Sequence, residues 1–270
     1  MIPPKQILLP VDFSERSLDA AREAEVLARR FHSCVTVLHV VDPNEDERGR
    51  FEPGGDKAHE LQNILAHDFT EASITRIVRE GDPAEEIVSF AGASPVDLIV
   101  MAGHAYQPFE SFLVGSVAAE VLRNANCPVW LSVRAGKGLP PIFRRVLCAV
   151  DLAAGTESVI NWATEFAAAF TAQLFVLHVI RSHESDEPPD DPDEWLSHAE
   201  REELEKAKLK LGATGEIRFA GGDISESVCR QATKLHADLV VIGRSPKAGE
   251  VGTTRIADYI RKSPCPVVRM

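Results

Sequence analysis

Aromatic residues, cysteine pairs and long apolar runs are all scarce in this sequence. Aromatics make up 6% of the 270 residues, so the core has to be built mainly from Val, Ile, Leu and Ala. The five cysteines are odd in number and none stands in a C-x-x-C pair, which excludes a disulfide framework and a cysteine-rich zinc site. No run approaches the ~18 apolar residues of a membrane-spanning helix, and the amino terminus has no apolar signal region. The sequence therefore predicts a cytoplasmic protein that does not contact a membrane.

Positively charged residues are fewer than negatively charged ones. Lys and Arg number 29 against 41 Asp and Glu, which gives a formal net charge of −12. A chain this acidic is repelled by the phosphate backbone of DNA or RNA unless it carries a local basic patch. The densest basic pairs, Arg29-Arg30 and Arg144-Arg145, are expected at a helix end and at the start of a strand. Nucleic acid is therefore excluded as the main partner.

An internal repeat organises what is present. Four motifs recur in the same order: ILLPVD at residues 7–12 and VLCAVD at 146–151, LHV at 38–40 and 177–179, DLIVMA at 97–102 and DLVVIG at 238–243, and CPV at 127–129 and 265–267. The offset stays between 138 residues for the last pair and 141 residues for the third. A repeat of this length predicts two domains, at residues 1–135 and 142–270, with residues 135–141 as a linker.

The order of apolar runs and amphipathic stretches predicts the fold class. In the first half we expect strands at residues 6–11, 35–41, 74–79, 97–102 and 129–133, and helices at 15–31, 57–72, 83–91 and 116–124. Ser14 and Asp82 are the predicted N-caps of two of these helices, with Pro83 at the first helical position. Alternating strands and helices predict an α/β protein in which each half is an open parallel sheet with right-handed crossovers.

Candidate binding residues follow from that topology. Ligands of open parallel sheets bind beyond the carboxyl ends of the strands, where Asp12, Val40 and the loop from Ala102 are expected. The Asp12 carboxylate can accept hydrogen bonds from a ribose or a base, or it can simply cap the following helix. Gly115 and Ser116 open a helix, where backbone N–H groups and the helix dipole favour an anion; a plain Ser helix start is the alternative.

These motifs together resemble one family. PVDFS at residues 10–14, LHVVD at 38–42, MAGHA at 101–105, GSVA at 115–118 and CPV at 127–129 resemble the universal stress protein family, and the resemblance covers the whole chain as two tandem copies. It implies two tandem open five-stranded parallel sheets flanked by helices, similar to Rossmann and adenine nucleotide alpha-hydrolase folds. It also implies an internal pseudo-dimer in which strands 129–133 and 267–270 pair, and raises a homodimer of the chain as a further expectation.

The resemblance also implies a ligand, ATP or AMP with Mg²⁺. Some members of the family bind ATP through the pattern G-x-x-G, nine residues, then G-S or G-T, whereas others lack the pattern and do not bind ATP. Carried over by position, the first copy would surround the adenosine and phosphates with Pro10, Asp12, Val40, Ala102, His104, Ala105, Gly115, Ser116 and Val117. The corresponding positions of the second copy are Asp151, Val179, Gly243, Gly252 and Thr253.

The chain departs from that pattern in both copies. Ala102 and Ala105 stand where the pattern has glycine, although the spacing of nine residues to Gly115 is intact. Where glycine is needed for close approach or for positive φ, alanine is expected to cost ~1 kcal/mol of strain. In the second copy Pro246 replaces the second glycine, and only residues 247–251 separate it from Gly252. Nucleotide binding is therefore expected mainly in the first copy.

No catalytic constellation is visible in the sequence. His39 and His178 are expected as hydrogen-bonded structural histidines within strands, and the acidic stretch at 183–194 as a solvated loop. For His104, a phosphate contact and a solvated loop position both stay open. The leading interpretation is a stress-response regulator that binds ATP and hydrolyses it slowly at most. The alternatives are a protein–protein interaction scaffold that binds no nucleotide, and a hydrolase acting on another small molecule in the same cleft.

Overall fold

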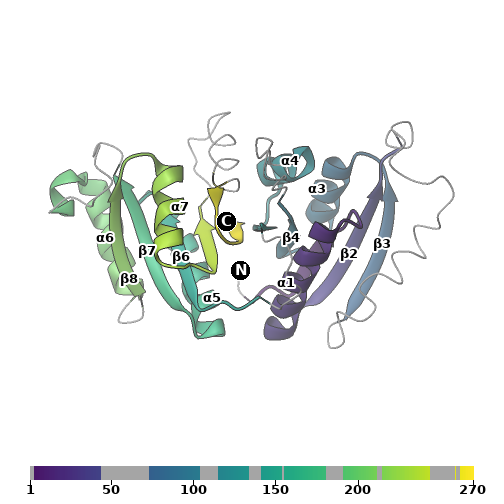
Figure 1. Cartoon of the computed structure of the whole chain (residues 1–270), viewed down its shortest axis with the longest axis horizontal. Coiled ribbons are helices and arrows are strands. Elements are labelled where there is room, and N and C mark those ends of the chain that lie inside the picture. Colours follow the sequence, from purple (N-terminus) through teal and green to yellow (C-terminus); the bar gives the residue numbers. More distant parts are fainter. Residues whose placement is uncertain are drawn as a thin grey trace. The chain divides into compact units, whose positions relative to one another are not determined.

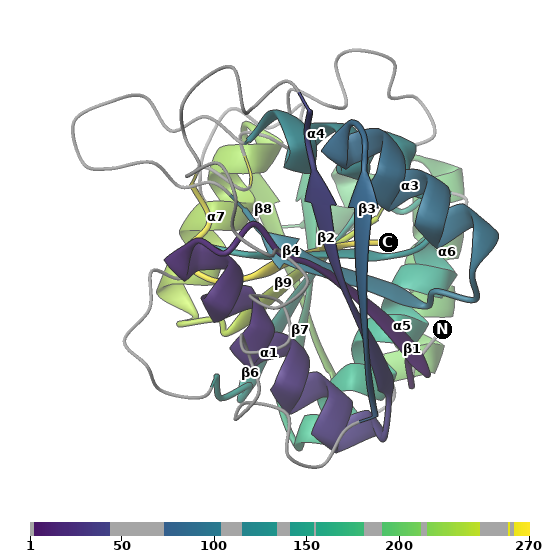
Figure 2. The same ribbon diagram turned by 90° about the vertical axis from the view of Figure 1, so that its right-hand side faces the viewer.

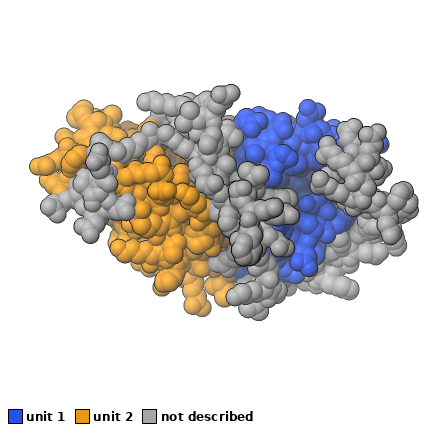
Figure 3. All heavy atoms as spheres, turned by 45° about the horizontal axis from the view of Figure 1, so that its top comes forward, with its two compact units in different colours: residues 1, 3–141 blue, residues 2, 142–270 orange. Residues whose placement is uncertain are grey.

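The computed structural model describes residues 3–43, 73–103, 115–133, 141–153, 155–180, 191–211, 215–243, 259 and 262–270. Contacts between Cα atoms divide the chain into two compact units, Pro3–Pro141 and Ile142–Met270 (Figure 3). The helix expected at residues 57–72 lies outside the described residues. So do the linker at 135–140 and four of the candidate site residues, His104, Ala105, Gly252 and Thr253.

The described residues of the first unit contain a parallel sheet of five strands. Its spatial order is β3-β2-β1-β4-β5, and every pair of neighbours in it is parallel. The strands are β1 (Gln6–Pro10), β2 (Cys34–Val41), β3 (Ile74–Glu80), β4 (Leu98–Ala102) and β5 (Val129–Ser132). The central strands β1 and β4 are continuous apolar runs because helices cover both of their faces. Leu8 and Ile99, which pair in register, are both 0% exposed.

Three described helices connect these strands: α1 (Glu15–Phe31), α3 (Pro83–Ala93) and α4 (Ser116–Asn124). Helix α1 begins where predicted, because Ser14 Oγ accepts a hydrogen bond from the Ser17 backbone N–H at 3.3 Å. Helix α3 begins in the same way at Asp82, whose Oδ1 accepts from the Glu85 N–H at 2.9 Å. Each cap satisfies one of the backbone donors that a helix start leaves unpaired.

The helices form a layer on each face of the first sheet. The chain moves from β1 through α1 to β2 in one direction and from β4 through α4 to β5 in the other. Right-handed crossovers in opposite directions place α1 and α4 on opposite faces. Helix α3 packs against α4 and β2, and Figure 2 shows α1 on one side of β2 and β3 and α3 on the other.

The second unit repeats this arrangement. Its described strands have the order β10-β9-β6-β7-β8, again with parallel neighbours. They are β6 (Arg145–Val150), β7 (Gln173–Ile180), β8 (Gly215–Gly221), β9 (Leu239–Ile242) and β10 (Val267–Arg269). The described helices are α5 (Thr156–Phe170), α6 (His198–Leu211) and α7 (Ile224–Lys234), labelled in Figure 1. The predicted α/β class with open parallel sheets flanked by helices is confirmed.

The repeat extends to individual hydrogen bonds. Asp97 Oδ2 accepts from the backbone N–H groups of Lys5 and Gln6 at 2.7 and 3.0 Å, and ties the start of β1 to the start of β4. In the second unit Asp238 Oδ2 accepts from the N–H groups of the equivalent residues at 2.8 and 3.0 Å. One expectation differs. Part of the acidic stretch expected as loop forms a 3-10 helix, Pro192–Trp195.

Candidate functional site

The order of strands in the first unit reverses between β1 and β4. From β1 the chain proceeds outward through β2 to β3, whereas β4 lies on the other side of β1 and leads to β5. Leu8 of β1 pairs with Ile99 of β4. Asp12 and Gly103 each follow four residues later, so both come just past the carboxyl ends of adjacent strands. A reversal of this kind is where open α/β sheets bind ligands, because the two following loops diverge there.

Asp12 is exposed at this point and is held by Ser14. Its Oδ1 accepts from the Ser14 backbone N–H at 3.1 Å and from the Ser14 hydroxyl at 2.6 Å. Because Ser14 Oγ itself accepts from the Ser17 N–H, its single hydrogen is directed at Asp12. Ser14, and not Asp12, therefore caps α1. The capping interpretation of Asp12 is wrong, and the carboxylate is instead fixed in a turn just before the helix.

The residue after Asp12 has an unusual backbone conformation. Phe13 has φ of 60°, in the left-handed region that side chains other than Asn and Asp rarely adopt. Leu152, which follows Asp151 in the second unit, has φ of 49°. A strained residue beside an exposed carboxylate in both copies is the kind of outlier that clusters at ligand sites. Neither residue was among the sequence candidates, because the residues around each aspartate indicate a turn but not its φ angles.

The other first-unit candidates lie around the same sheet edge. Pro10 is the buried last residue of β1, and Val40 is half-buried near the end of β2. Ala102 ends β4, and Gly103 after it donates its N–H to the Ser132 carbonyl at 2.7 Å. The structure thus brings Pro10, Asp12, Val40 and Ala102 to neighbouring strand ends, as predicted.

Helix α4 supplies the expected anion-binding geometry. Its N-cap is Gly115, with φ of −56°, which has no side chain to cap the first turn. The first turn also carries no acidic residue, Ser116 is exposed and Val117 is half-buried. Because α4 follows β4 in the chain, its N-terminus begins on the side of the sheet where β4 ends. The backbone N–H groups of the first turn and the positive end of the helix dipole favour an anion there.

The expectation that Ala102 strains the backbone is wrong. Ala102 is the last residue of a strand, and its φ is not positive. Its counterpart Gly243 shows where a side chain at this position would point. A Cβ built on Gly243 would lie 3.1 Å from Cγ2 of Val159 on α5. The repeat places Ala20 of α1, which is 0% exposed, at the position of Val159, and by this equivalence we expect the methyl of Ala102 to be directed at α1.

The second unit keeps only part of this arrangement. Asp151 is exposed, and its Oδ1 accepts from the Ala153 N–H at 3.2 Å, but alanine has no hydroxyl to add the second bond that Ser14 makes. Val179 is 7% exposed, and Gly243 follows β9. The described candidates Asp151, Val179 and Gly243 occupy positions equivalent to those of the first unit, with a carboxylate that is held less firmly.

A comparison of both units with known protein families identifies the family of the chain. The universal stress protein family matches the chain twice, over residues 4–134 and 142–269. The chain belongs to the universal stress protein family. Each match covers one of the two units almost completely, so this member carries two universal stress protein domains in tandem.

Individual relatives match one domain at a time. A universal stress protein of Methanocaldococcus jannaschii is 35% identical over 136 residues, which are 46% of this chain and 79% of the relative. A universal stress protein of Thermus aquaticus is 30% identical over 135 residues, 47% of this chain and 97% of the relative. Among solved structures, a universal stress protein of Archaeoglobus fulgidus has a TM-score of 0.74 at 21% identity. That similarity covers 98% of this chain and 97% of the other, and shows a shared fold.

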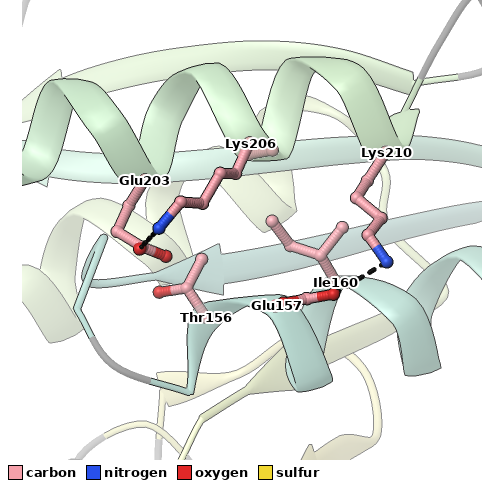
Figure 4. Close-up of a pocket in the computed structure, with 7 residues that line it drawn as sticks. Thr156, Glu157, Ile160, Glu203, Lys206 and Lys210 are labelled. Atoms are coloured by element: carbon pink, nitrogen blue, oxygen red, sulfur yellow. Dashed lines mark hydrogen bonds and ion pairs between the residues drawn. The ribbon is translucent and has the colours of Figure 1, made fainter.

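A separate hollow lies between α5 and α6 of the second unit. It is a shallow hollow lined by Thr156, Glu157, Ile160, Glu203, Lys206, Ala207 and Lys210. Both lysines are paired, Lys206 with Glu203 at 2.7 Å and Lys210 with Glu157 at 2.8 Å (Figure 4). The hydrogen bond and charge of Lys210 lower the pKa of Glu157. Because each cation already faces a carboxylate, this hollow is a poor anion site, and the sheet edge remains the candidate.

Two further observations concern the described residues. No helix among them is both long and apolar enough to cross a membrane. None of the five cysteines, which all lie among the described residues, forms a disulfide, and Cys148, Cys229 and Cys265 are buried whereas Cys34 is exposed.

Proposed function

We propose that the first unit binds an adenine nucleotide at the carboxyl ends of β1, β2 and β4, and that the chain acts as a nucleotide-responsive regulator in the stress response. The main observation behind this proposal is the exposed Asp12 carboxylate, which two hydrogen bonds from Ser14 hold at the strand reversal. A carboxylate fixed before the ligand arrives loses little side-chain entropy on binding. The resemblance to nucleotide-binding members of the family adds support, since by position it puts Asp12 at the adenosine.

The ribose is the group that fits Asp12 best. Carboxylate oxygens only accept hydrogen bonds, and two adjacent ribose hydroxyls are donors. The half-buried Val40 at the end of β2 offers an apolar contact and backbone groups to the base. Hydrogen bonds to charged groups contribute ~1.5–3 kcal/mol, which corresponds to about 10- to 100-fold in affinity. Asp12 therefore carries a substantial share of the proposed affinity.

The phosphates fit the start of α4. Ser116 offers a hydroxyl, and Gly115 at the N-cap has no side chain that competes for the N–H groups of the first helical turn. The methyl of Ala102, directed at α1, leaves the ligand side of the strand end open. Mg²⁺ would be held chiefly by the phosphates, which is its usual mode in nucleotide sites. Bound nucleotide would thereby join Asp12 to the start of α4.

The test uses the full chain as purified. Denaturation of the purified chain is expected to release bound adenine nucleotide, which mass spectrometry then identifies. Addition of ATP with Mg²⁺ at millimolar concentration is expected to raise the melting temperature, because a ligand that binds only the folded state stabilises it by mass action. GTP serves as the matched control and is expected to have a smaller effect. A chain that carries no nucleotide and shows no shift with ATP would contradict the proposal and favour the scaffold.

A further inference from the structure

His39 on β2 contacts both residues that flank Asp12. Its Nδ1 lies 2.9 Å from the backbone carbonyl oxygen of Val11. Its ring packs against the ring of Phe13, with centroids 4.3 Å apart and an angle of 45° between the planes. His39 is 5% exposed, so the side chain is a fixed part of the core. One buried residue of the neighbouring strand thus holds the chain immediately before and immediately after the exposed carboxylate.

The bond to Val11 also selects a tautomer. A carbonyl oxygen can only accept, so His39 Nδ1 must carry the hydrogen, and in the neutral ring Nε2 is then unprotonated. The same choice is made in the second unit, where His178 Nδ1 lies 3.0 Å from the Val150 carbonyl oxygen. This explains why a histidine stands in the middle of an apolar strand in both copies.

Phe13 needs to be held because its backbone is strained. A φ of 60° persists in a phenylalanine only where the surroundings over-determine it. The ring contact with His39 is one such determinant, and the turn from Asp12 to Ser14 is the other. If the ring contact is lost, Phe13 can relax toward negative φ, and the direction of the Asp12 carboxylate changes with it.

The second unit shows what the ring contact adds. Leu152 replaces Phe13, and the His178 ring meets Phe219 instead, edge-on at 6.3 Å. The bond from histidine to the carbonyl is therefore common to both units, whereas the ring contact on the residue after the aspartate belongs to the first. The first unit fixes its aspartate by Ser14, by the Val11 carbonyl and by the Phe13 ring together.

We propose that His39 is a positioning residue, which fixes the direction of the Asp12 carboxylate through the Val11 carbonyl and the Phe13 ring. Its effect on ligand affinity rests on the proposed nucleotide site, whereas its effect on the Asp12 turn does not. The two can be tested separately in the full chain.

The first test is spectroscopic and needs no ligand. Long-range ¹H–¹⁵N spectra of the chain with ¹⁵N-labelled histidine are expected to show two rings with protonated Nδ1 and bare Nε2. One of these signals should vanish in His39→Asn and the other in His178→Asn. A His39 ring protonated at Nε2 alone would overturn the proposal, because Nδ1 could then not donate to Val11.

The second test follows the turn itself by hydrogen exchange. The Ser14 N–H, bonded to Asp12, is expected to exchange about tenfold faster or more in His39→Leu, which has no donor and no ring. His39→Asn retains an amide N–H that can reach the Val11 carbonyl, and should keep more of the protection. His178→Leu is the matched control for the loss of a buried strand histidine and should leave Ser14 unchanged. Equal protection of Ser14 in wild type and His39→Leu would overturn the proposal.

The third test measures affinity for ATP with Mg²⁺ by calorimetry. Affinity is expected to fall about tenfold in His39→Leu, to fall less in His39→Asn, and to stay within about twofold in His178→Leu. If wild type does not bind, the proposed function fails, and the Ser14 exchange rates still decide whether His39 positions the turn. If wild type and His39→Leu bind equally well, the positioning role fails while the nucleotide site stands.

Discussion

Cγ2 of Val159 lies 3.1 Å from the point at which a Cβ on Gly243 would stand. Contacts this short are tighter than side chains normally make, so the valine on α5 and the glycine after β9 fit each other. In the first unit the equivalent positions hold Ala20 and Ala102, a smaller helix residue against a larger strand residue. The two units therefore fill the same space between helix and strand end in different ways, and the choice of glycine or alanine there is a matter of packing.

Gly243→Ala is expected to lower the free energy of unfolding in the otherwise unchanged chain, because the new methyl overlaps Val159. Overpacking of this kind costs ~1–3 kcal/mol. In a Val159→Ala background the same substitution should be neutral or slightly stabilising, since alanine reduces the entropy of the unfolded chain by ~0.4–1 kcal/mol relative to glycine. Urea unfolding of the four variants of this double-mutant cycle measures the coupling. Additive effects would contradict the packing argument.

Ala102→Gly is expected to leave affinity for ATP within about threefold of wild type, because the methyl faces α1 and not the ligand. The substitution should lower the free energy of unfolding by ~0.5–1 kcal/mol, the usual penalty for glycine within a strand. Calorimetry and urea unfolding on the same preparations measure both quantities. A gain in affinity of tenfold or more would show instead that the methyl obstructs the phosphates.

Asp12→Asn is expected to weaken binding of ATP by about 10- to 100-fold, because an amide cannot replace a charged acceptor for the ribose. Ser14→Ala should weaken binding less, and should also cost ~1 kcal/mol of stability through the lost cap of α1. Asp151→Asn is the matched control in the second unit and should leave the main binding event intact. If Asp151→Asn has the larger effect, the nucleotide is bound by the second unit.

Phe13→Gly is expected to unfold at higher urea concentration than Phe13→Ala. Both variants lose the ring that packs on His39, but only alanine keeps the penalty of a left-handed backbone, ~1–2 kcal/mol. Glycine's greater freedom in the unfolded chain offsets part of that gain. The same comparison at Leu152 should have the same sign. A Phe13→Ala chain as stable as Phe13→Gly would mean that the turn relaxes freely.

Cys148 is expected to make the stability of the second unit sensitive to alkaline pH. Burial raises the pKa of its thiol from 9.0 to about 12. Between these values the unfolded chain has lost the proton and the folded chain retains it, so the free energy of unfolding falls as pH rises through this window. In Cys148→Ala the free energy of unfolding should fall less steeply with pH, and the difference in slope should correspond to at most one proton. Urea unfolding at a series of pH values from 9.0 upward measures the difference, and parallel curves would contradict the assignment.

The sequence determined most of the architecture because its signals are local and repeated. Helices α1 and α4 have the predicted bounds, since Ser14 and Gly115 mark their starts and the apolar periodicity marks their extent. The repeated Asp97 and Asp238 mark equivalent strands, and the matched motifs predicted both copies of the sheet. The predicted pairing of strands 129–133 and 267–270 across the pseudo-dimer stays a prediction, as do the homodimer and the domain bounds at 135 and 142.

The candidate site was predicted in outline, because carboxyl ends of parallel strands gather at one edge whatever the side chains. The sequence left open the direction in which each candidate side chain points. Whether Asp12 caps a helix or faces a ligand depends on the Ser14 hydroxyl, whose single hydrogen can be placed only when its partners are placed. Whether the methyl of Ala102 obstructs a ligand depends on Ala20, 82 positions earlier in the chain.

The chain's own residues thus determined the fold class and the tandem repeat, since periodicity, caps and motif order are local features of the sequence. Only the tertiary structure decided that Phe13 is strained, that His39 contacts both neighbours of Asp12, and that a side chain at position 243 would point at a helix. Those facts arise from contacts between residues far apart in the chain, because packing against neighbours in the folded protein fixes each rotamer and φ angle.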